Sequence, residues 1–412
     1  MKNIIKNIVL FLFMVVLISC SNETEDKIKV SNITDLKIQD ALVTVSLSSN
    51  HQYYSLINNN EEKPYQIIKN QIDNSYQLIF VTDLSPQEVK EFTLKEISAD
   101  QMKEFTPRTY AELSMKEGNI YYDKRFRGDK FIKVNHLKVP AIHTDHDALF
   151  KYEGPGWESE KVGYRFYLDW RNATDIFGKK KNQLILDQVG THDTVAKDDS
   201  YHNMQEWGMD IFKVGNSLGI GSIGMWADDK VNMVSKTDSI ICNIPYTGPI
   251  EARIQTDYYG WQVNNKKYDL RAGLSIVAGS RLTKCELKIS DNPENLVTGL
   301  VKHENTELLK SGNKKGWNYL ALYGNQTLVN DQDKLGIVIF YPQTDLIEIT
   351  EDPLSYIVKL KPSDGKVIYY FAAAWDQEED GIRNTEEFKN YLDKTITLLN
   401  NPVFVEIKKI KL

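Results

Sequence analysis

Histidine and tryptophan side chains gather in one stretch of the chain, between residues 136 and 215. This stretch holds five of the seven histidines and three of the seven tryptophans. The histidines are His136, His143, His146, His192 and His202. Imidazole changes its charge near neutral pH and therefore suits proton transfer, and indole rings suit sugar-binding surfaces. We expect the chemistry of the protein in this stretch.

Two of its segments offer candidate catalytic histidines. The segment His143-Thr-Asp-His146-Asp147 predicts a general base or a metal-binding loop, and the alternative is a polar loop whose histidines are hydrogen-bonded. A metal is not expected, because a third ligand with recognisable spacing does not follow. His202 stands beside Tyr201 and is a second candidate base, or else a structural histidine. The sequence does not call for a cofactor.

A strand pattern between Gly163 and Arg171 separates polar from apolar side chains. Alternation predicts Tyr164, Phe166 and Leu168 on a core face, and Arg165, Tyr167, Asp169 and Arg171 on the other face. Arg165 could bind a carboxylate through two hydrogen bonds, Tyr167 could transfer a proton, and Asp169 could accept a substrate hydroxyl. The alternative is a ladder of ion pairs on the surface.

Other candidate substrate-binding residues lie around this strand. Gly154-Pro155-Gly156 forces a tight turn, which favours Trp157 as a sugar platform and Glu158 as a hydroxyl acceptor, unless Trp157 simply packs. The remaining candidates are Lys179, Trp207 and Arg253. Lys179 starts a run of lysines, which is more typical of a solvated turn. Arg253 lies on a second strand, where it shares a polar face with Gln255 and Asp257.

The N-terminus reads as a targeting segment rather than as part of the fold. Lys2 and Lys6 precede an apolar run from Ile8 to Ile18 that is too short to span a bilayer. It ends at Leu17-Ile-Ser-Cys20, which resembles the site where lipoprotein signal peptides are cleaved. We expect residues 1–19 to be removed, Cys20 to be lipidated, and residues 20–27 to tether an outer-membrane lipoprotein on the periplasmic face or at the cell surface. An ordinary secretory signal is the alternative.

The rest of the chain predicts an all-β protein of two domains. Residues 28–103 show the alternation and turns of a small immunoglobulin-like sandwich, and residues 104–412 show many strands typical of a large galactose-mutarotase-like supersandwich with few helices. The expected strands include 162–170, 183–189, 250–259, 270–278, 335–341 and 367–374. The clearest helix begins after Asn384, whose spacing to Glu387 is a capping signature, and a closing strand follows from Val403.

Composition excludes some classes of protein. The net charge is −7, and a basic stripe for phosphates is not apparent, which argues against nucleic acid as a partner. The chain lacks a Walker loop and a Gly-x-Gly-x-x-Gly fingerprint followed by a Rossmann pattern. Cys242 and Cys285 form either a disulfide, as an oxidising compartment permits, or two buried thiols.

The long motifs resemble a known family. They are Glu153 to Asp169, Arg171 to Lys179, Tyr201-His202, Trp207-Gly-Met-Asp210 and Lys213 to Gly219. Over most of the chain this pattern is similar to lipoproteins of polysaccharide-utilisation loci that were long described as a domain of unknown function. The resemblance implies an oligosaccharide dehydratase of ulvan degradation, a carbon–oxygen lyase.

Such an enzyme removes water from the uronic acid at the non-reducing end. Its product is a 4,5-unsaturated uronate, which an unsaturated-uronyl hydrolase of the same pathway consumes. The expected functional partners are this hydrolase and lyases of the same pathway. The implied partners are an anionic oligosaccharide and, through the lipid anchor only, a membrane. Two alternatives stay open: a surface glycan-binding lipoprotein without catalysis, and another sugar enzyme such as an endolytic uronate lyase or an epimerase.

Overall fold

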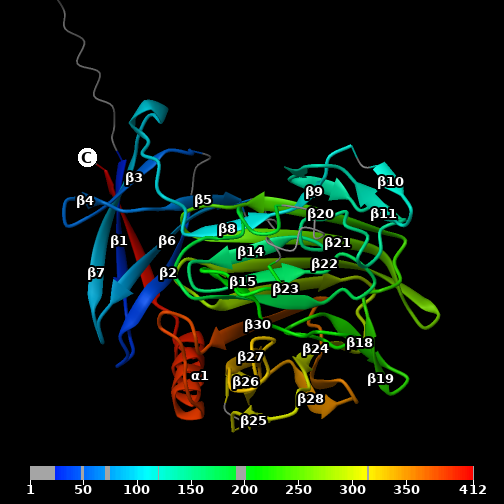
Figure 1. Cartoon of the computed structure of the whole chain (residues 1–412). Helices are drawn as coiled ribbons and strands as arrows, with labels where there is room; N and C mark the ends of the chain where they lie inside the picture. Colours follow the sequence, from blue (N-terminus) through cyan, green and yellow to red (C-terminus); the bar gives the residue numbers. More distant parts are fainter. Residues whose placement is uncertain are drawn as a thin grey trace, which may run out of the picture.

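The structure is a computed structural model that describes residues 24–47, 51–69, 75–118, 120–191, 201–312 and 315–411. Its regular elements are strands, apart from one α-helix and one short 3-10 turn, Ala99–Gln101, in the described ranges, so the predicted all-β class is confirmed (Figure 1). Cys20, the segment 1–19 and His192 lie outside the described residues.

Two sheets form a small sandwich at the N-terminal end. One sheet has the order β31 (Phe404–Lys411), β1 (Thr24–Ser31), β7 (Val89–Glu96), β3 (Tyr54–Asn58) and β4 (Glu61–Glu62). The other has the order β2 (Ile38–Ser46), β6 (Tyr76–Leu84) and β5 (Gln66–Lys69). Alternate residues such as Val43 and Val45 point inward and pack against Phe80 and Phe92 in a separate core, as period-2 alternation requires.

The C-terminal strand corrects the expected domain limits. The sequence analysis assigned residues up to 412 to the large domain, but β31 pairs along its whole length with β1 of the small sandwich. Val403 and Val405 pack against the core of that sandwich. The burial of these alternate side chains accounts for the placement, because an amphipathic strand needs an apolar surface to cover.

The large part of the chain is a sandwich of one long sheet and two shorter ones. The long sheet contains β13 (His136–Lys138), β20 (Ser239–Tyr246), β21 (Glu251–Val263), β22 (Lys266–Val277), β23 (Leu282–Ile289), β30 (Lys366–Trp375), β27 (Leu335–Pro342), β26 (Trp317–Gly324) and β25 (Thr306–Lys310), in this order. One five-stranded sheet contains β17 (Gly208–Asp210), β16 (Thr174–Lys179), β15 (Gly163–Phe166), β14 (Gly156–Ser159) and β8 (Thr109–Glu112). The second contains β19 (Lys230–Met233), β18 (Gly224–Ala227), β24 (Leu296–Val301), β29 (Ser355–Leu360) and β28 (Leu346–Glu351). The strand pairs β10 (Ile120–Tyr122) with β11 (Arg125–Arg127), and β9 (Ser114–Lys116) with β12 (Phe131–Lys133), complete this part.

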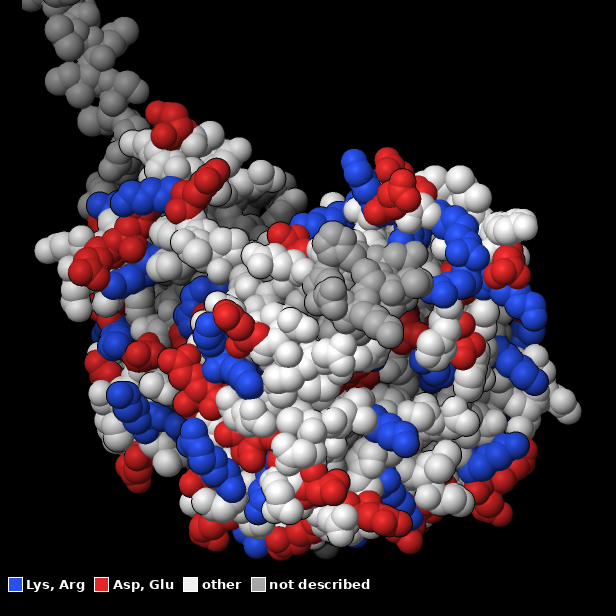
Figure 2. Space-filling view, viewed as in Figure 1, with Lys and Arg blue, Asp and Glu red and all other residues white. Residues whose placement is uncertain are grey.

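The main core lies between these sheets. It joins side chains of the long sheet, such as Phe371 and Trp261, to Trp157 and Tyr164 of the five-stranded sheet and to Leu300 of the other. On the face seen in Figure 2, basic and acidic side chains are interspersed rather than gathered by sign.

The predicted helix is confirmed as α1 (Thr385–Asn400). The side-chain oxygen of Asn384 accepts a hydrogen bond from the Glu387 N–H at 2.9 Å, which satisfies an otherwise unpaired helix-terminal donor. Phe388, Leu392 and Ile396 recur every four residues and pack on the outer face of β26 and β27. In the described ranges, none of the helices is long and apolar enough to cross a membrane.

The expected strand over residues 183–189 is wrong, because these residues form bends and turns. The backbone N–H groups of Ile185 and Leu186 donate to the carboxylate of Glu158, at 2.8 and 2.7 Å, rather than to a neighbouring strand. The apolar side chains that suggested a strand are still buried, in a small cluster with Tyr152 and Phe177.

Tyr164 provides a test of the main core. It is fully buried, its hydroxyl donates to the Arg281 carbonyl at 2.8 Å, and it accepts from the Ala373 N–H at 2.9 Å. Tyr164→Phe keeps the ring but leaves both backbone groups unpaired, so we expect the free energy of unfolding to fall by about 1–3 kcal/mol in denaturant titrations. Tyr259→Phe, at a side chain that is 39% exposed, is the control. Equal unfolding midpoints for the wild type and Tyr164→Phe would contradict the expectation.

Candidate active site

Three neighbouring strands of the first five-stranded sheet place charged side chains together on the face that turns away from the main core. Arg165 of β15 lies opposite Asp175 of β16, and the next strand, β17, ends with Asp210. β17 approaches β16 closely through Gly208, where φ is 134° and a Cβ atom would lie 1.8 Å from the Gly178 carbonyl oxygen. Only glycine tolerates this position.

Arg165 is the centre of a buried network, which we call the Arg165 network. Its guanidinium lies 2.7 Å from carboxylate oxygens of both Asp175 and Asp210, and donates to the hydroxyls of Tyr201 and Tyr167 at 3.1 Å each. Tyr167 in turn donates to Asp175. Two carboxylates against one guanidinium leave the network with an excess of negative charge.

The electrostatics of the network favour groups that hold protons. Burial raises the pKa of Asp175 to about 6, the Asp210 carboxylate adds to the rise, and Arg165 opposes it. Burial also raises the pKa of Tyr201 to about 12, so this phenol is protonated at neutral pH. Since Arg165 donates to the Tyr201 oxygen, the Tyr201 hydrogen can point to another acceptor.

His202 connects the network to solvent. Its Nδ1 lies 3.1 Å from the Asp210 carboxylate, its ring packs on Tyr201 with centroids 4.3 Å apart, and 52% of its side chain is exposed. A buried carboxylate behind a half-exposed imidazole orients the ring. The arrangement suits a general base that a ligand can reach.

A second set of charges adjoins the network through Glu153. Its carboxylate lies 3.4 Å from Arg165 and 2.8 Å from Arg171, and Arg171 also pairs with Asp169. Burial alone would raise the pKa of Glu153, but the charges of Arg165 and Arg171 outweigh it and hold this pKa below the usual value. The Arg171 guanidinium covers the Tyr167 ring, 4.0 Å from its centroid. These contacts join the two sets into one polar surface.

The structure therefore brings together four of the predicted site residues: Arg165, Tyr167, Asp169 and His202. The predicted alternation is correct within β15, which ends at Phe166, so the expected strand over residues 162–170 is too long. The expectation that Arg165 clamps a substrate carboxylate is wrong, because its side chain is 4% exposed and already surrounded by protein carboxylates. Asp169 is likewise occupied, since it accepts hydrogen bonds from the Arg171 backbone and side chain.

The other two candidate histidines lie outside the network. The His143 side chain is only 2% exposed, and its Nδ1 is hydrogen-bonded at 2.8 Å to Asp147, whose carboxylate also accepts from the backbone of Thr144 and Leu149. His143 therefore belongs to a closed polar loop, although its Nε2 is buried without a hydrogen-bond partner. His146 is 77% exposed, and the nearest carboxylates are Asp145 and Glu153. His143 is therefore enclosed, whereas His146 lies in solvent beside the Glu153 set.

Trp157, Glu158 and Lys179 are interior residues, which corrects their assignment to substrate binding. Trp157 is fully buried, stacks on Tyr164 and donates to Thr283. Glu158 and Lys179 form an ion pair of 2.8 Å in which both side chains are inaccessible. The chain does turn before Trp157, at residues 151–154, but Trp157 lies on β14 with its indole on the core face, against Tyr164 and Thr283.

The remaining predicted residues are spread over the fold. Trp207 is half-buried and packs edge-on against Phe177, near the Arg165 network. Arg253 lies on the long sheet, paired with Glu286 at 2.6 Å, and is separated from the network by the main core. In the described part of the chain, groups of three side chains that could hold a metal ion are absent.

Cys242 and Cys285 are two buried thiols. They lie on β20 and β23, which are separated by β21 and β22. At about 4.8 Å between neighbouring strands, these positions are roughly twice as far apart as a disulfide allows.

Sequence reasoning missed Asp175, Asp210 and Glu153 as members of the site. Each lies within a quoted motif, but only the register of β15 and β16 puts Asp175 opposite Arg165. The sequence could have revealed Asp175 if the two segments had been interpreted as a hairpin. An acidic residue is expected opposite a buried arginine on the neighbouring strand.

The raised pKa of Asp175 predicts a pH dependence. Because the folded protein holds this proton more tightly than the unfolded chain, the group stabilises the fold at low pH, and this contribution disappears as the pH rises through about 6. Thermal unfolding of the wild type and Asp175→Asn between pH 4 and 8 tests this. We expect the wild type to gain stability relative to the variant as the pH falls. A difference in melting temperature that is constant with pH would contradict it.

Comparisons with known proteins give a family and two solved structures. A glycosyl hydrolase family 38 protein from Enterococcus faecalis aligns with 94% of this chain and 48% of its own, at 10% identity and a TM-score of 0.46. An alpha-mannosidase from Enterococcus faecalis V583 aligns with 94% of this chain and 46% of its own, at the same identity and TM-score. The chain thus spans about half the length of these proteins. No curated protein matches it in sequence.

The family model covers nearly all of the described structure. It matches residues 30–405, which include the large sandwich, most of the small one, the Arg165 network and α1. This match shows that the chain belongs to the family described as domain of unknown function (DUF4861).

Proposed function

We propose that this protein is an oligosaccharide dehydratase that removes water from a uronic acid at the non-reducing end of an ulvan-type oligosaccharide. The product is a 4,5-unsaturated uronate, and the chain length is preserved. The proposal includes attachment to the outer membrane through a lipid on Cys20. The observation that carries the catalytic part is the half-exposed His202, whose Nδ1 is bound to the buried carboxylate of Asp210.

The elimination breaks the C5–H and C4–O bonds and forms the C4–C5 double bond. In the proposal, His202 takes the C5 proton, and Asp210 stabilises the imidazolium that results. The imidazolium then gives this proton to the departing 4-hydroxyl, so that water leaves and His202 returns to its neutral form.

The substrate carboxylate needs a positive neighbour, because the C5 proton is poorly acidic until that charge is neutralised. Arg171 is assigned this role. Its side chain is 11% exposed against 4% for Arg165, and it covers the ring of Tyr167 at the edge of the network. Glu153 and Asp169 hold it in place.

Mass spectrometry of a saturated uronate oligosaccharide before and after incubation tests the proposal. The expected product is lighter by one water and absorbs in the ultraviolet, because its double bond is conjugated with the carboxylate. Shorter oligosaccharides would identify an endolytic lyase or a hydrolase instead. Unchanged oligosaccharides that nevertheless bind would identify a glycan-binding protein without catalysis.

A further inference from the structure

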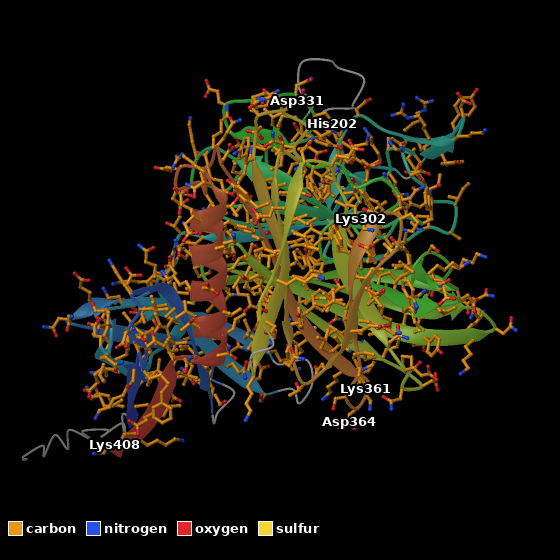
Figure 3. The ribbon with its side chains drawn as sticks, turned by 90° about the horizontal axis from the view of Figure 1, so that it is seen from below. His202, Lys302, Asp331, Lys361, Asp364 and Lys408 are labelled. Carbon is orange, nitrogen blue, oxygen red and sulfur yellow. The ribbon has the colours of Figure 1, made fainter. Side chains whose placement is uncertain are left out.

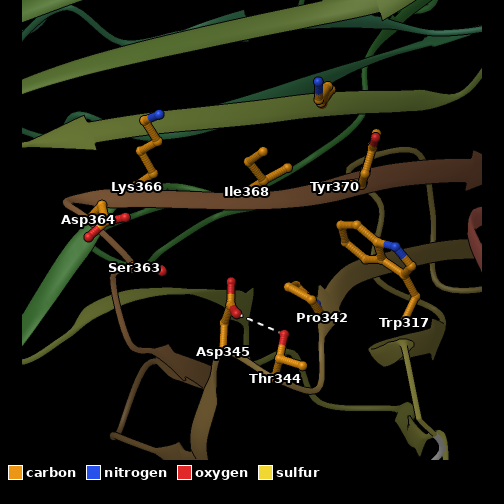
Figure 4. A pocket seen from close by; sticks show the side chains of 10 residues that line it. Trp317, Pro342, Thr344, Asp345, Ser363, Asp364, Lys366, Ile368 and Tyr370 are labelled. Carbon is orange, nitrogen blue, oxygen red and sulfur yellow. Dashed lines mark hydrogen bonds between the residues drawn. The ribbon is translucent and has the colours of Figure 1, made fainter.

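A groove with a volume of about 500 Å³ crosses the outer face of the long sheet (Figure 4). Its lining includes Lys284, Trp317, Asp345, Asp364, Lys366 and Tyr370, and we call it the outer groove. The lining combines aromatic rings, carboxylates and ammonium groups, which is the composition of a polar-ligand site rather than of a packing defect.

The outer groove is separate from the candidate active site. Along β30, Val367 and Tyr369 point into the main core, so the alternate residues Lys366, Ile368 and Tyr370 face the groove on the other side of the sheet. Figure 3 shows His202 at one end of the view and Asp364 at the opposite end.

One end of the groove is aromatic and firmly held. The rings of Trp317 and Tyr370 meet edge to face with centroids 5.1 Å apart, and the close-up shows the indole between Tyr370 and Pro342 (Figure 4). The backbone N–H of Trp317 donates at 2.8 Å to the side chain of Asn400, the last residue of α1. This bond anchors the backbone, and the contact with Tyr370 holds the indole. A half-buried ring held by packing is preorganised for stacking.

The other end of the groove carries lysines of β30 and β23, with Asp364 beside Lys366. Lys366 lies directly opposite Lys288 of β23 in the sheet register. Lys284 pairs with Glu286 at 2.8 Å, whereas neither Lys366 nor Lys288 has a carboxylate within ion-pair distance among the described residues. Like charges on directly opposite strand positions repel each other, so a bound anion would stabilise this end.

We propose that the outer groove binds a stretch of acidic polysaccharide, with one sugar ring stacked on Trp317 and an acid group of the same chain at Lys366 and Lys288. From Lys366 to Tyr370, β30 rises by about 13 Å, which accommodates several linked rings rather than one. Sugar hydroxyls can donate to Asp345, which lies between the two ends, and to Asp364, which lies beside Lys366 (Figure 4). The site would hold the polymer while shorter chains react elsewhere on the protein.

Affinity electrophoresis in native gels that contain ulvan or polygalacturonate, with neutral pullulan for comparison, tests this inference. The choice of uronate polymers rests on the proposed function. All proteins carry His202→Ala, so the probe is not consumed and binding is measured whether or not the protein is a dehydratase. The variants are Trp317→Ala and the double variant Lys288→Gln/Lys366→Gln. The matched controls are Tyr122→Ala, at a side chain that is 72% exposed on β10, and Lys230→Gln at an exposed lysine of β19.

We expect at least one uronate polymer to retard the parent protein and both controls equally. Trp317→Ala should raise the dissociation constant about tenfold, because a stacked aromatic contact is lost. The double lysine variant should bind more weakly yet unfold at the same or a higher temperature, because like-charge repulsion is removed. That combination separates a binding role from a structural one.

Three results would overturn the inference. The first is a parent protein that neither uronate polymer retards. The second is retardation that survives in both variants, and the third is equal retardation by pullulan, which would exclude recognition of acid groups.

Discussion

His202→Ala is expected to lower turnover of a saturated uronate oligosaccharide by about 10²–10⁴-fold, the usual contribution of a general acid–base group. The side chain is half-exposed and contributes little to the core, so the free energy of unfolding should stay within about 0.5 kcal/mol of the wild type. Initial rates, followed by ultraviolet absorbance, and a denaturant titration measure the two effects.

The control for this variant is His136→Ala. His136 is also exposed, but it lies on β13 with its Nδ1 at 2.7 Å from Asn243, remote from the Arg165 network. Added imidazole should restore part of the activity of His202→Ala, because the missing ring leaves room next to Asp210. Full activity in His202→Ala, or equal losses in both histidine variants, would remove His202 from the mechanism.

Glu158→Ala is expected to lower the free energy of unfolding by about 3–5 kcal/mol, since it leaves the Lys179 ammonium charged and buried without its partner. Burial raises the pKa of Glu158 and lowers that of Lys179, so burial opposes charge on both residues and their attraction offsets it. The variant also releases the backbone N–H groups of Ile185 and Leu186. Denaturant titration measures the loss.

Two further variants sharpen this test. Glu348→Ala breaks the exposed pair of Glu348 and Lys359 and should change stability by less than about 1 kcal/mol. The double variant Glu158→Ala/Lys179→Ala should lose clearly less than the sum of the single variants, because neither charge is then left isolated. Strict additivity would show that the two charges do not stabilise each other.

These two predictions concern residues that the sequence treats alike. Glu158 and His202 both stand among aromatic residues and glycines, and both were assigned to the site. Only the structure distinguishes them, because Glu158 lies on a central strand under the turns of residues 181–190, whereas His202 lies in a loop at the edge of the same sheet.

The sequence by itself determined the local features. Period-2 alternation identified β21, β22, β27 and β30 within a few residues, and the spacing of Asn384 and Glu387 identified the start of α1. It also assigned Arg165 to the side of β15 opposite to Tyr164 and Phe166, because side-chain direction in a strand follows from neighbouring positions alone.

Tertiary structure alone decided what covers each face of a strand and which strands are neighbours in a sheet. Strand parity does not reveal that the polar side of β15 is closed by Tyr201 and by the turns that contain Ile185, which makes Arg165 an internal charge rather than a substrate clamp. Nor does it reveal that β20 and β23 are too far apart for Cys242 to reach Cys285, or that β31 joins the N-terminal sheet. Burial and strand order are set by contacts between residues far apart in the chain, and a local pattern of polar and apolar side chains carries no record of those partners.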